Sequence, residues 1–217
     1  MHRLSKLLHI GIINTVRLNV HYFGLEGVFY PIIFASRNLK ILSLKGTVKC
    51  ENASLGAIRL GLECPGAVDK RFNRCIWQNS GEIIFQGKAY LGAGTKIVNS
   101  GQLVFGNNCA VTGNSTFLCY EHIYIGSNSF ISWECMISDT DFHKIKSISD
   151  GKCLNDNKPV HIGEHVWIGA RCTVLKGSRI PDDSVLAAGS IVTKKLKSNN
   201  AIYVSNNIVK GDITWEA

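Results

Sequence analysis

The feature that most constrains the fold is a six-residue period between residues 162 and 196. Every sixth position there is aliphatic, and the residue four positions further on is small or aliphatic. A helix repeats about every 3.6 residues and a strand about every two, so neither element explains this period, whereas a repeat solenoid does. The aliphatic positions are Ile162, Ile168, Val174, Ile180, Leu186 and Val192, and those that follow them are Val166, Cys172, Ser178, Ser184, Ser190 and Leu196.

An earlier part of the chain carries the same period in longer units. Apolar residues occur in triplets six residues apart, and each triplet lies 20 residues after the one before. This length predicts one triangular coil per unit, with the marked side chains pointing into a narrow core. Such a coil cannot bury its inward face alone, so coils must stack, with about 4.8 Å between neighbouring strands. The triplets are Phe85, Leu91 and Ile97; Phe105, Val111 and Phe117; and Ile125, Ile131 and Ile137.

The segment V-W-I-G-A-R-C-T-V-L-K-G-S-R-I-P-D-D-S-V-L-A-A-G-S-I-V-T-K-K, residues 166–195, resembles the C-terminal half of the hexapeptide-repeat acyltransferases, especially bacterial sugar acetyltransferases of the galactoside and maltose type. The resemblance implies an all-β fold, a left-handed parallel β-helix. Its handedness comes from the resemblance alone, because parallel crossovers are usually right-handed. The family also implies acetyl-CoA as donor and a homotrimer with the cofactor between subunits.

Three regions are expected along the chain. Residues 1–41 lack the period and are basic, which predicts a partly helical cap on the open end of the solenoid; peripheral contact with a membrane is the alternative use of such a segment. Residues 42–197 are expected to form the β-helix, with a loop at 144–159 where charged, glycine and asparagine residues break the period. Residues 198–217 form a short C-terminal tail.

The composition limits the possible binding partners and the cellular compartment of the protein. The net charge of +8 favours an anionic partner, such as a phosphorylated cofactor, a nucleotide- or lipid-linked sugar, or nucleic acid. The eight cysteines show no C-x-x-C spacing, and Cys109, Cys135 and Cys172 fall on small inward positions, so we expect reduced thiols and a cytoplasmic protein. Neither a signal peptide nor a membrane span is expected, and the inner membrane surface is the alternative location.

A histidine interrupts the coil pattern. Overlaying the 20-residue units aligns Leu103, Ile123 and His143, so an imidazole stands where the repeat favours an aliphatic residue. Imidazole suits proton removal from a hydroxyl group near neutral pH. In the family the essential histidine comes just before the loop, and His143 matches that place, so we expect it to be a general base. Asp141, a catalytic candidate, or Asp139 would orient its ring, and their spacing does not decide between them.

The resemblance also implies a cofactor-binding set. The ring of Trp167 would form a wall beside the pantetheine and thioester end of the cofactor. Ala170 and Ala188 would offer backbone groups to the pantetheine arm, because a small side chain allows close approach. Thr193 and Lys194 would reach the nucleotide phosphates, where a basic cluster is electrostatically suited.

We therefore expect an acetyl-CoA-dependent O-acetyltransferase acting on a hydroxyl of a sugar or surface-polysaccharide unit. Trp133 and Phe142, aromatic residues near His143 in the coil overlay, are the candidates for acceptor binding. The alternative from another class is a non-catalytic β-helix scaffold or binding module. No metal is expected, because the histidines lack the spacing of a shared metal site as in γ-class carbonic anhydrases. No nucleic-acid partner is expected either, because no recognition motif is present.

Overall fold

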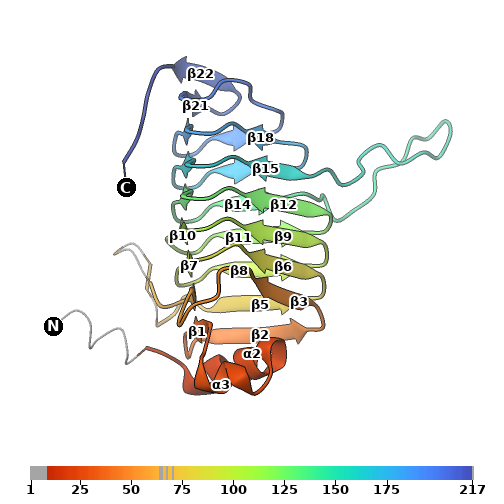
Figure 1. Ribbon diagram of the computed structural model, residues 1–217. Coiled ribbons are helices and arrows are strands. Elements are labelled where there is room, and N and C mark those ends of the chain that lie inside the picture. Colours follow the sequence, from red (N-terminus) through yellow and green to blue (C-terminus); the bar gives the residue numbers. More distant parts are fainter. Residues whose placement is uncertain (1–8, 64–65, 67, 70, 217) are drawn as a thin grey trace.

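The computed structural model describes residues 9–63, 66, 68–69 and 71–216. Figure 1 shows the chain wound into coils that stack in layers, with the helices α2 (Ile12–Phe23) and α3 (Glu26–Phe29) covering one end. Each coil contributes strands to three sheets, so the described part of the chain is a parallel β-helix with a triangular cross-section. The predicted all-β class and the helical cap are confirmed.

Among the described residues, the first sheet has nine strands and the second has seven. Neighbouring strands are parallel, except for β21 and β22, which are antiparallel and close the far end. The first sheet contains, in order, β1 (Ile33–Ala35), β4 (Ile58–Leu60), β7 (Ala89–Leu91), β10 (Cys109–Val111), β13 (Phe130–Ile131), β16 (Trp167–Ile168), β19 (Val185–Leu186), β21 (Ile202–Val204) and β22 (Asn207–Lys210). The second contains β2 (Leu39–Leu44), β5 (Cys75–Asn79), β8 (Lys96–Asn99), β11 (Thr116–Cys119), β14 (Met136–Ser138), β17 (Thr173–Val174) and β20 (Ile191–Val192).

The third sheet has six strands and completes the prism. The chain passes from the first sheet to the second and then to the third before it returns to the first, so each coil has three distinct corners. The strands of the third sheet are β3 (Thr47–Cys50), β6 (Glu82–Phe85), β9 (Gln102–Phe105), β12 (His122–Ile125), β15 (Val160–Ile162) and β18 (Arg179–Ile180).

The residues marked by the six-residue period form the core. The six aliphatic positions from Ile162 to Val192 are each 0% exposed. Phe85 and Phe105 stack with ring centres 5.2 Å apart, and Phe117 meets Phe105 edge-on at 5.4 Å. These contacts join neighbouring coils through dispersion and ring electrostatics as well as through backbone hydrogen bonds.

The cysteines behave as small core residues. Cys109, Cys135 and Cys172 are buried at inward positions, as expected. Each of the seven cysteines that the structure describes has a free thiol. Burial raises the pKa of Cys109 to about 12, so its thiol stays protonated and unreactive near neutral pH.

The helical cap is tied to the first coil by Asn19. Within the described residues, the helices are α2 (Ile12–Phe23) and α3 (Glu26–Phe29). The side-chain amide of Asn19 donates to the carbonyl oxygen of Ile33 at 2.7 Å and accepts from its N–H at 3.0 Å. Asn19 thus supplies the hydrogen bonds that a preceding coil would supply to β1. The expected contribution of residues 1–8 to the cap lies outside the described residues.

Both expected boundaries of the β-helix are too narrow. Strand β1 lies within residues 1–41 yet pairs with β4, and β21 lies beyond residue 197 yet pairs with β19. Backbone pairing therefore continues past the segments where the hydrophobic period is visible, because hydrogen bonds between coils do not depend on side-chain type. No helix in the described ranges is long and apolar enough to cross a membrane.

A long loop leaves the prism at the corner between the second and third sheets, near the expected place. It connects β14 with β15 and projects away from the coils in Figure 1. The 20-residue overlay is wrong here: Ile123 pairs with Val160 and not with a residue at His143. The chain has already left the ladder before residue 143, so His143 belongs to the loop and not to a strand.

Candidate functional site

His143 lies exposed at the base of this loop. A tight turn fixes its backbone: its N–H donates to the carbonyl oxygen of Asp141 at 2.7 Å, and Phe142 adopts a left-handed φ of 62°. The ring of Phe142 packs edge-on against Tyr120, with centres 5.3 Å apart. The turn is therefore anchored to the previous coil, and it presents the imidazole outside the filled core.

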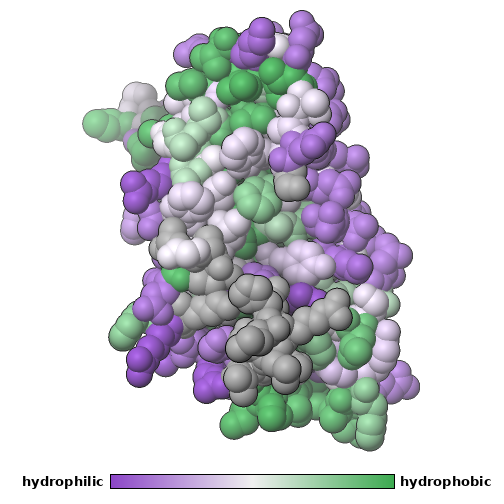
Figure 2. Space-filling model, turned by 90° about the vertical axis from the view of Figure 1, so that its left-hand side faces the viewer, coloured by the Kyte–Doolittle hydropathy of each residue, from purple (hydrophilic) through white to green (hydrophobic). Residues whose placement is uncertain are grey.

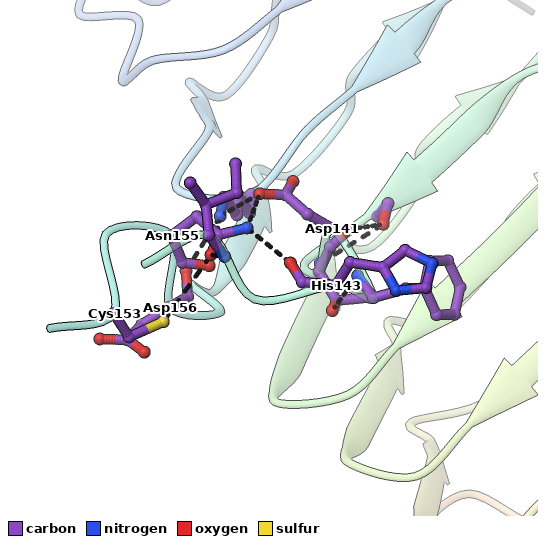
Figure 3. A network of polar contacts seen from close by, with 10 residues as sticks. Asp141, His143, Cys153, Asn155 and Asp156 are labelled. Atoms are coloured by element: carbon purple, nitrogen blue, oxygen red, sulfur yellow. Dashed lines mark hydrogen bonds and ion pairs between the residues drawn. The ribbon is translucent and has the colours of Figure 1, made fainter. Parts of the chain in front are cut away.

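Asp141 holds the loop rather than the imidazole. Its Oδ2 atom lies 2.5 Å from Nζ of Lys176 and accepts from the side-chain amide of Asn155 at 2.9 Å. In Figure 3 the ring of His143 points away from this carboxylate. Hydrogen bonds from Lys176 and then Asn155 lower the pKa of Asp141, which keeps the carboxylate charged. The expected placement of Asp141 beside the imidazole is not what the structure has.

Asn155 joins the two ends of the loop. Its side-chain amide also donates to the carbonyl oxygen of His143 at 2.8 Å, and its Oδ1 accepts from the N–H of Ile145 at 2.6 Å. Lys176 in turn donates to the carbonyl oxygen of Asn155 at 2.7 Å. The segment that carries His143 is thus bonded to the returning strand of the loop and to the regular coils.

Asp139 has a structural role at the point of departure. It is 0% exposed, and its two carboxylate oxygens accept from the backbone N–H groups of Tyr120 and Glu121, each at 2.8 Å. One coil below, the N–H groups of Ser100 and Gly101 bond to the carbonyl oxygen of Cys119. The carboxylate of Asp139 therefore replaces a backbone acceptor where the chain leaves the ladder.

Trp167 lies on the first sheet, one coil beyond the departure of the loop. Its indole is 39% exposed, and Nε1 donates to Oγ of Ser132 at 3.2 Å. Trp215 from the C-terminal segment lies 6.0 Å away, measured between ring centres, and stacks on His165 at 4.4 Å. The indole of Trp167 is thus partly exposed, while its N–H already has a hydrogen-bond partner.

The predicted site residues separate into two groups at different corners of the prism. The turns between the first and second sheets carry Trp133, Ala170 and the exposed Ala188, next to Trp167 on the first sheet. The corner between the second and third sheets carries Asp141, Phe142 and His143 on the loop, and Thr193 and Lys194 directly after β20. Within one chain the two groups are not brought together.

A basic pocket of about 730 Å³ opens beside Thr193. Four cationic side chains line it, and no carboxylate is among its described lining residues. In the described part of the chain, Lys158, Arg179 and Lys195 have no side-chain hydrogen bond or ion pair, whereas Lys176 pairs with Asp141. Unpaired cations around a concave surface attract phosphate or carboxylate groups. Lys195 belongs to the predicted basic cluster, whereas Arg179 was not predicted, and their bridge across coils places the two in one column.

A second hollow, which sequence reasoning missed, lies on the first sheet below Trp167. Tyr90, Ala110 and Phe130 occupy equivalent outward positions on successive coils, and Trp167 follows Phe130 in the same column. Because Ala110 is small, a slot of about 330 Å³ opens between the two aromatic positions. Arg59 lies 5.1 Å above the Tyr90 ring at one end of the slot. The 20-residue spacing of positions 90, 110 and 130 is the sequence pattern from which this column could have been predicted.

In the described ranges, no three histidine, cysteine, aspartate or glutamate residues gather as a metal-binding group.

Comparisons with known proteins agree with this architecture. Residues 159–194 match a family model described as the hexapeptide repeat of succinyl-transferase. A galactoside O-acetyltransferase of Lactococcus lactis subsp. lactis (strain IL1403) is 33% identical over 140 residues, which are 64% of this chain and 64% of that protein. A polysialic acid O-acetyltransferase of Neisseria meningitidis is 30% identical over 146 residues, 67% of this chain and 55% of that protein.

A solved structure shares the fold. The crystal structure of the polySia specific acetyltransferase NeuO superposes with a TM-score of 0.57 at 20% identity, and the alignment covers 84% of this chain and 74% of the other. The chain spans 64% of the length of its galactoside relative and 55% of its polysialic acid relative. The stacked coils, the matched repeat and these relatives make this chain similar to the hexapeptide-repeat β-helix proteins, among them the sugar O-acetyltransferases.

Proposed function

We propose that this protein is an acetyl-CoA-dependent O-acetyltransferase that acts on a hydroxyl group of a saccharide, with His143 as general base. The observation that carries the proposal is the exposed imidazole of His143, held by a bonded turn where the loop leaves a family β-helix. The names of the relatives, which act on galactosides and polysialic acid, support a saccharide acceptor.

For acetyl transfer from a thioester to a hydroxyl group, the protein must position the two substrates and supply one proton acceptor. His143 takes the proton of the acceptor hydroxyl as its oxygen forms a bond to the thioester carbonyl carbon. The carbon–sulfur bond then breaks, and CoA leaves as the thiol after it receives that proton from the imidazolium. The acetyl group ends as an ester on the sugar, and no covalent enzyme intermediate is needed.

The donor is proposed to bind along the two groups of predicted residues. The partly exposed ring of Trp167 is available to the thioester end, and the small side chains at Ala170 and Ala188 leave the adjacent corner accessible. Thr193 and Lys194 lie beside the basic pocket, whose unpaired cations suit the phosphates of CoA. The residues present therefore fit an acylated, phosphate-bearing thiol.

The separation of the two groups supports a homotrimer. His143 and Trp167 lie at different places around one prism, so a single chain cannot place both on one thioester. A neighbouring copy can bring its Trp167 face to the His143 corner, and closed rotational symmetry repeats that contact. We therefore propose that each active site is shared between two subunits of the trimer.

The slot at Ala110 is the proposed place for a ring of the acceptor. Aromatic side chains flank it in the column that leads to Trp167, and Arg59 and Glu63 supply polar groups at one end. Sugar rings pack their apolar faces on aromatic side chains and their hydroxyls on polar ones. Trp133 and Phe142 remain proposed acceptor contacts from the two corners.

The compartment is proposed to be the cytoplasm, where acetyl-CoA is made. The free thiols of the described cysteines support a reducing environment. Peripheral contact with the inner membrane is proposed for the N-terminal cap.

The deciding experiment is the kinetics of His143→Gln with acetyl-CoA and a panel of galactosides and oligosialic acids, followed by thiol release. We expect kcat to fall by roughly 10²- to 10⁴-fold because the base is lost, while CoA affinity measured by calorimetry stays near the wild-type value. His122→Gln, a half-exposed histidine on β12, is the matched control. Thiol release by His143→Gln within a few fold of wild type removes His143 from the mechanism. A wild-type protein that binds no CoA supports the non-catalytic scaffold.

A further inference from the structure

The capped end of the β-helix has a dense group of exposed apolar side chains on α2, α3 and the residues that join and follow them. Ile13 is 82% exposed and Phe29 is 89% exposed. Figure 2 shows this end of the molecule as a hydrophobic band. We call this surface the end face, and its apolar members are Ile12, Ile13, Val16, Val20, Leu25, Val28, Phe29 and Tyr30.

The fold does not need these side chains. Helix α2 covers the first coil with its opposite side, where Thr15, Leu18 and Asn19 are buried. The most exposed members, Ile12, Ile13, Leu25 and Phe29, therefore add little to the packing of the described chain, and they cost solubility. A contiguous apolar patch of this kind on a water-exposed surface marks a contact with another apolar phase or partner.

The charges around the end face identify that partner. Arg17 lies on the same side of α2 as Ile13 and Val20, at spacings of four and three residues. Exposed Lys40 and Lys45 lie on and after β2 in the first coil, while Glu26 on α3 is the acidic residue of the cap. Apolar side chains interleaved with basic ones are the pattern of interfacial helices on anionic membranes. We propose that the end face docks the protein on a membrane surface that contains anionic lipids.

This docking fixes the orientation of the molecule. The coils stack away from the end face, so the β-helix would stand upright on the membrane with the His143 loop above it (Figure 1). In a trimer whose axis runs along the stack, three end faces lie on one side, and several weak contacts then combine. The docking rests on the proposed function only for its consequence, which is that lipid-linked saccharides would be the acceptors within reach.

The test is co-sedimentation of the full-length protein with vesicles of phosphatidylcholine, with and without phosphatidylglycerol. We expect binding to the anionic vesicles that weakens as salt is added. Ile13→Ser combined with Phe29→Ser should abolish it, and Arg17→Gln should weaken it by about fivefold. All three substitutions should leave acetyl transfer to a soluble acceptor unchanged, which separates this test from that of the proposed function.

The opposite end of the stack provides the control. Ile208 and Val209 on β22 are also exposed and apolar, so Ile208→Ser with Val209→Ser makes the same kind of double substitution at the other end of the stack. This variant should bind anionic vesicles as the wild type does. Absence of wild-type binding to the anionic vesicles, or equal loss in the two double variants, overturns the proposal. If the end-face variant instead lowers the mass of the protein in solution and vesicles are not bound, the end face joins copies of this chain.

Discussion

Nζ of Lys176 lies 2.5 Å from Oδ2 of Asp141, so a residue of the regular coils holds the turn that presents His143. Lys176 is largely buried, with 17% of its side chain exposed, and it also donates to the carbonyl oxygen of Asn155 at 2.7 Å. The imidazole is therefore positioned through a polar network rather than through a carboxylate of its own. Asp141 and Lys176 are positioning residues in this arrangement.

Removing the anchor should slow catalysis without unfolding the β-helix. In Lys176→Met the turn of His143 loses its link to the coils, and kcat should fall by roughly ten- to a hundredfold because the base is misplaced. The melting temperature should change little. Lys152→Met is the control, since Lys152 pairs with Asp150 at 3.1 Å in the outer part of the same loop. A wild-type kcat in Lys176→Met would show that the anchor is dispensable.

The pKa of Asp141 should report the same contact. Hydrogen bonds from Lys176 and Asn155 lower it, so the ion pair is complete above the ordinary aspartate pKa and is lost as the pH falls through the lowered pKa. A carboxyl-carbon NMR titration should show the midpoint rising toward about 3.9 in Lys176→Met. The midpoint should stay at its wild-type value in Lys152→Met. An unchanged midpoint in Lys176→Met would contradict the contact.

Asp139 should matter for stability rather than for the proton transfer. In Asp139→Asn, the amide NH₂ would replace one of the two carboxylate oxygens that accept from backbone N–H groups. One buried N–H would then have no acceptor, which costs about 1–3 kcal/mol. Urea unfolding should show that loss, with the pH profile of the remaining activity unchanged. Asp156→Asn, at an exposed position in the loop, serves as comparison. A shifted pH profile would show that Asp139 acts on the imidazole of His143.

The slot at Ala110 should decide acceptor binding. Its column is aromatic at Tyr90, Phe130 and Trp167, so Ala110→Phe continues an existing stack and should fold normally. The added ring fills the slot, and KM for the saccharide should rise by roughly tenfold or more, while CoA affinity is retained. Leu118→Phe, outward on β11 of the second sheet, is the matched control. Equal KM values for Ala110→Phe and wild type would place the acceptor elsewhere.

Much of the architecture follows from the six-residue spacing of apolar side chains. Every inward position of the three triplets and of the C-terminal repeat is buried, as predicted. The predicted limits of the β-helix were wrong where strands pair through their backbones without a hydrophobic repeat. Strands β1 and β21 lie outside the expected limits because backbone hydrogen bonds extend the ladder past the visible period.

Single candidate residues of the site could be named from the sequence, but their positions relative to one another could not. The loop was anticipated, yet the overlay aligned His143 with strand residues because it assumed that the coil continued, so the exposed place of His143 within the loop was not predicted. The two aspartates could not be separated from spacing, since their roles depend on where the chain turns. One caps the corner of the previous coil, and the other reaches forward to Lys176.

By itself, the sequence determined the stack of triangular coils, because a side chain at every sixth position must be apolar if a narrow prism is to exclude water. The tertiary structure alone decided which surfaces face one another. Residues 90, 110, 130 and 167 become one column on the first sheet, away from the corner that carries His143, because interstrand register, not distance along the chain, sets which side chains meet.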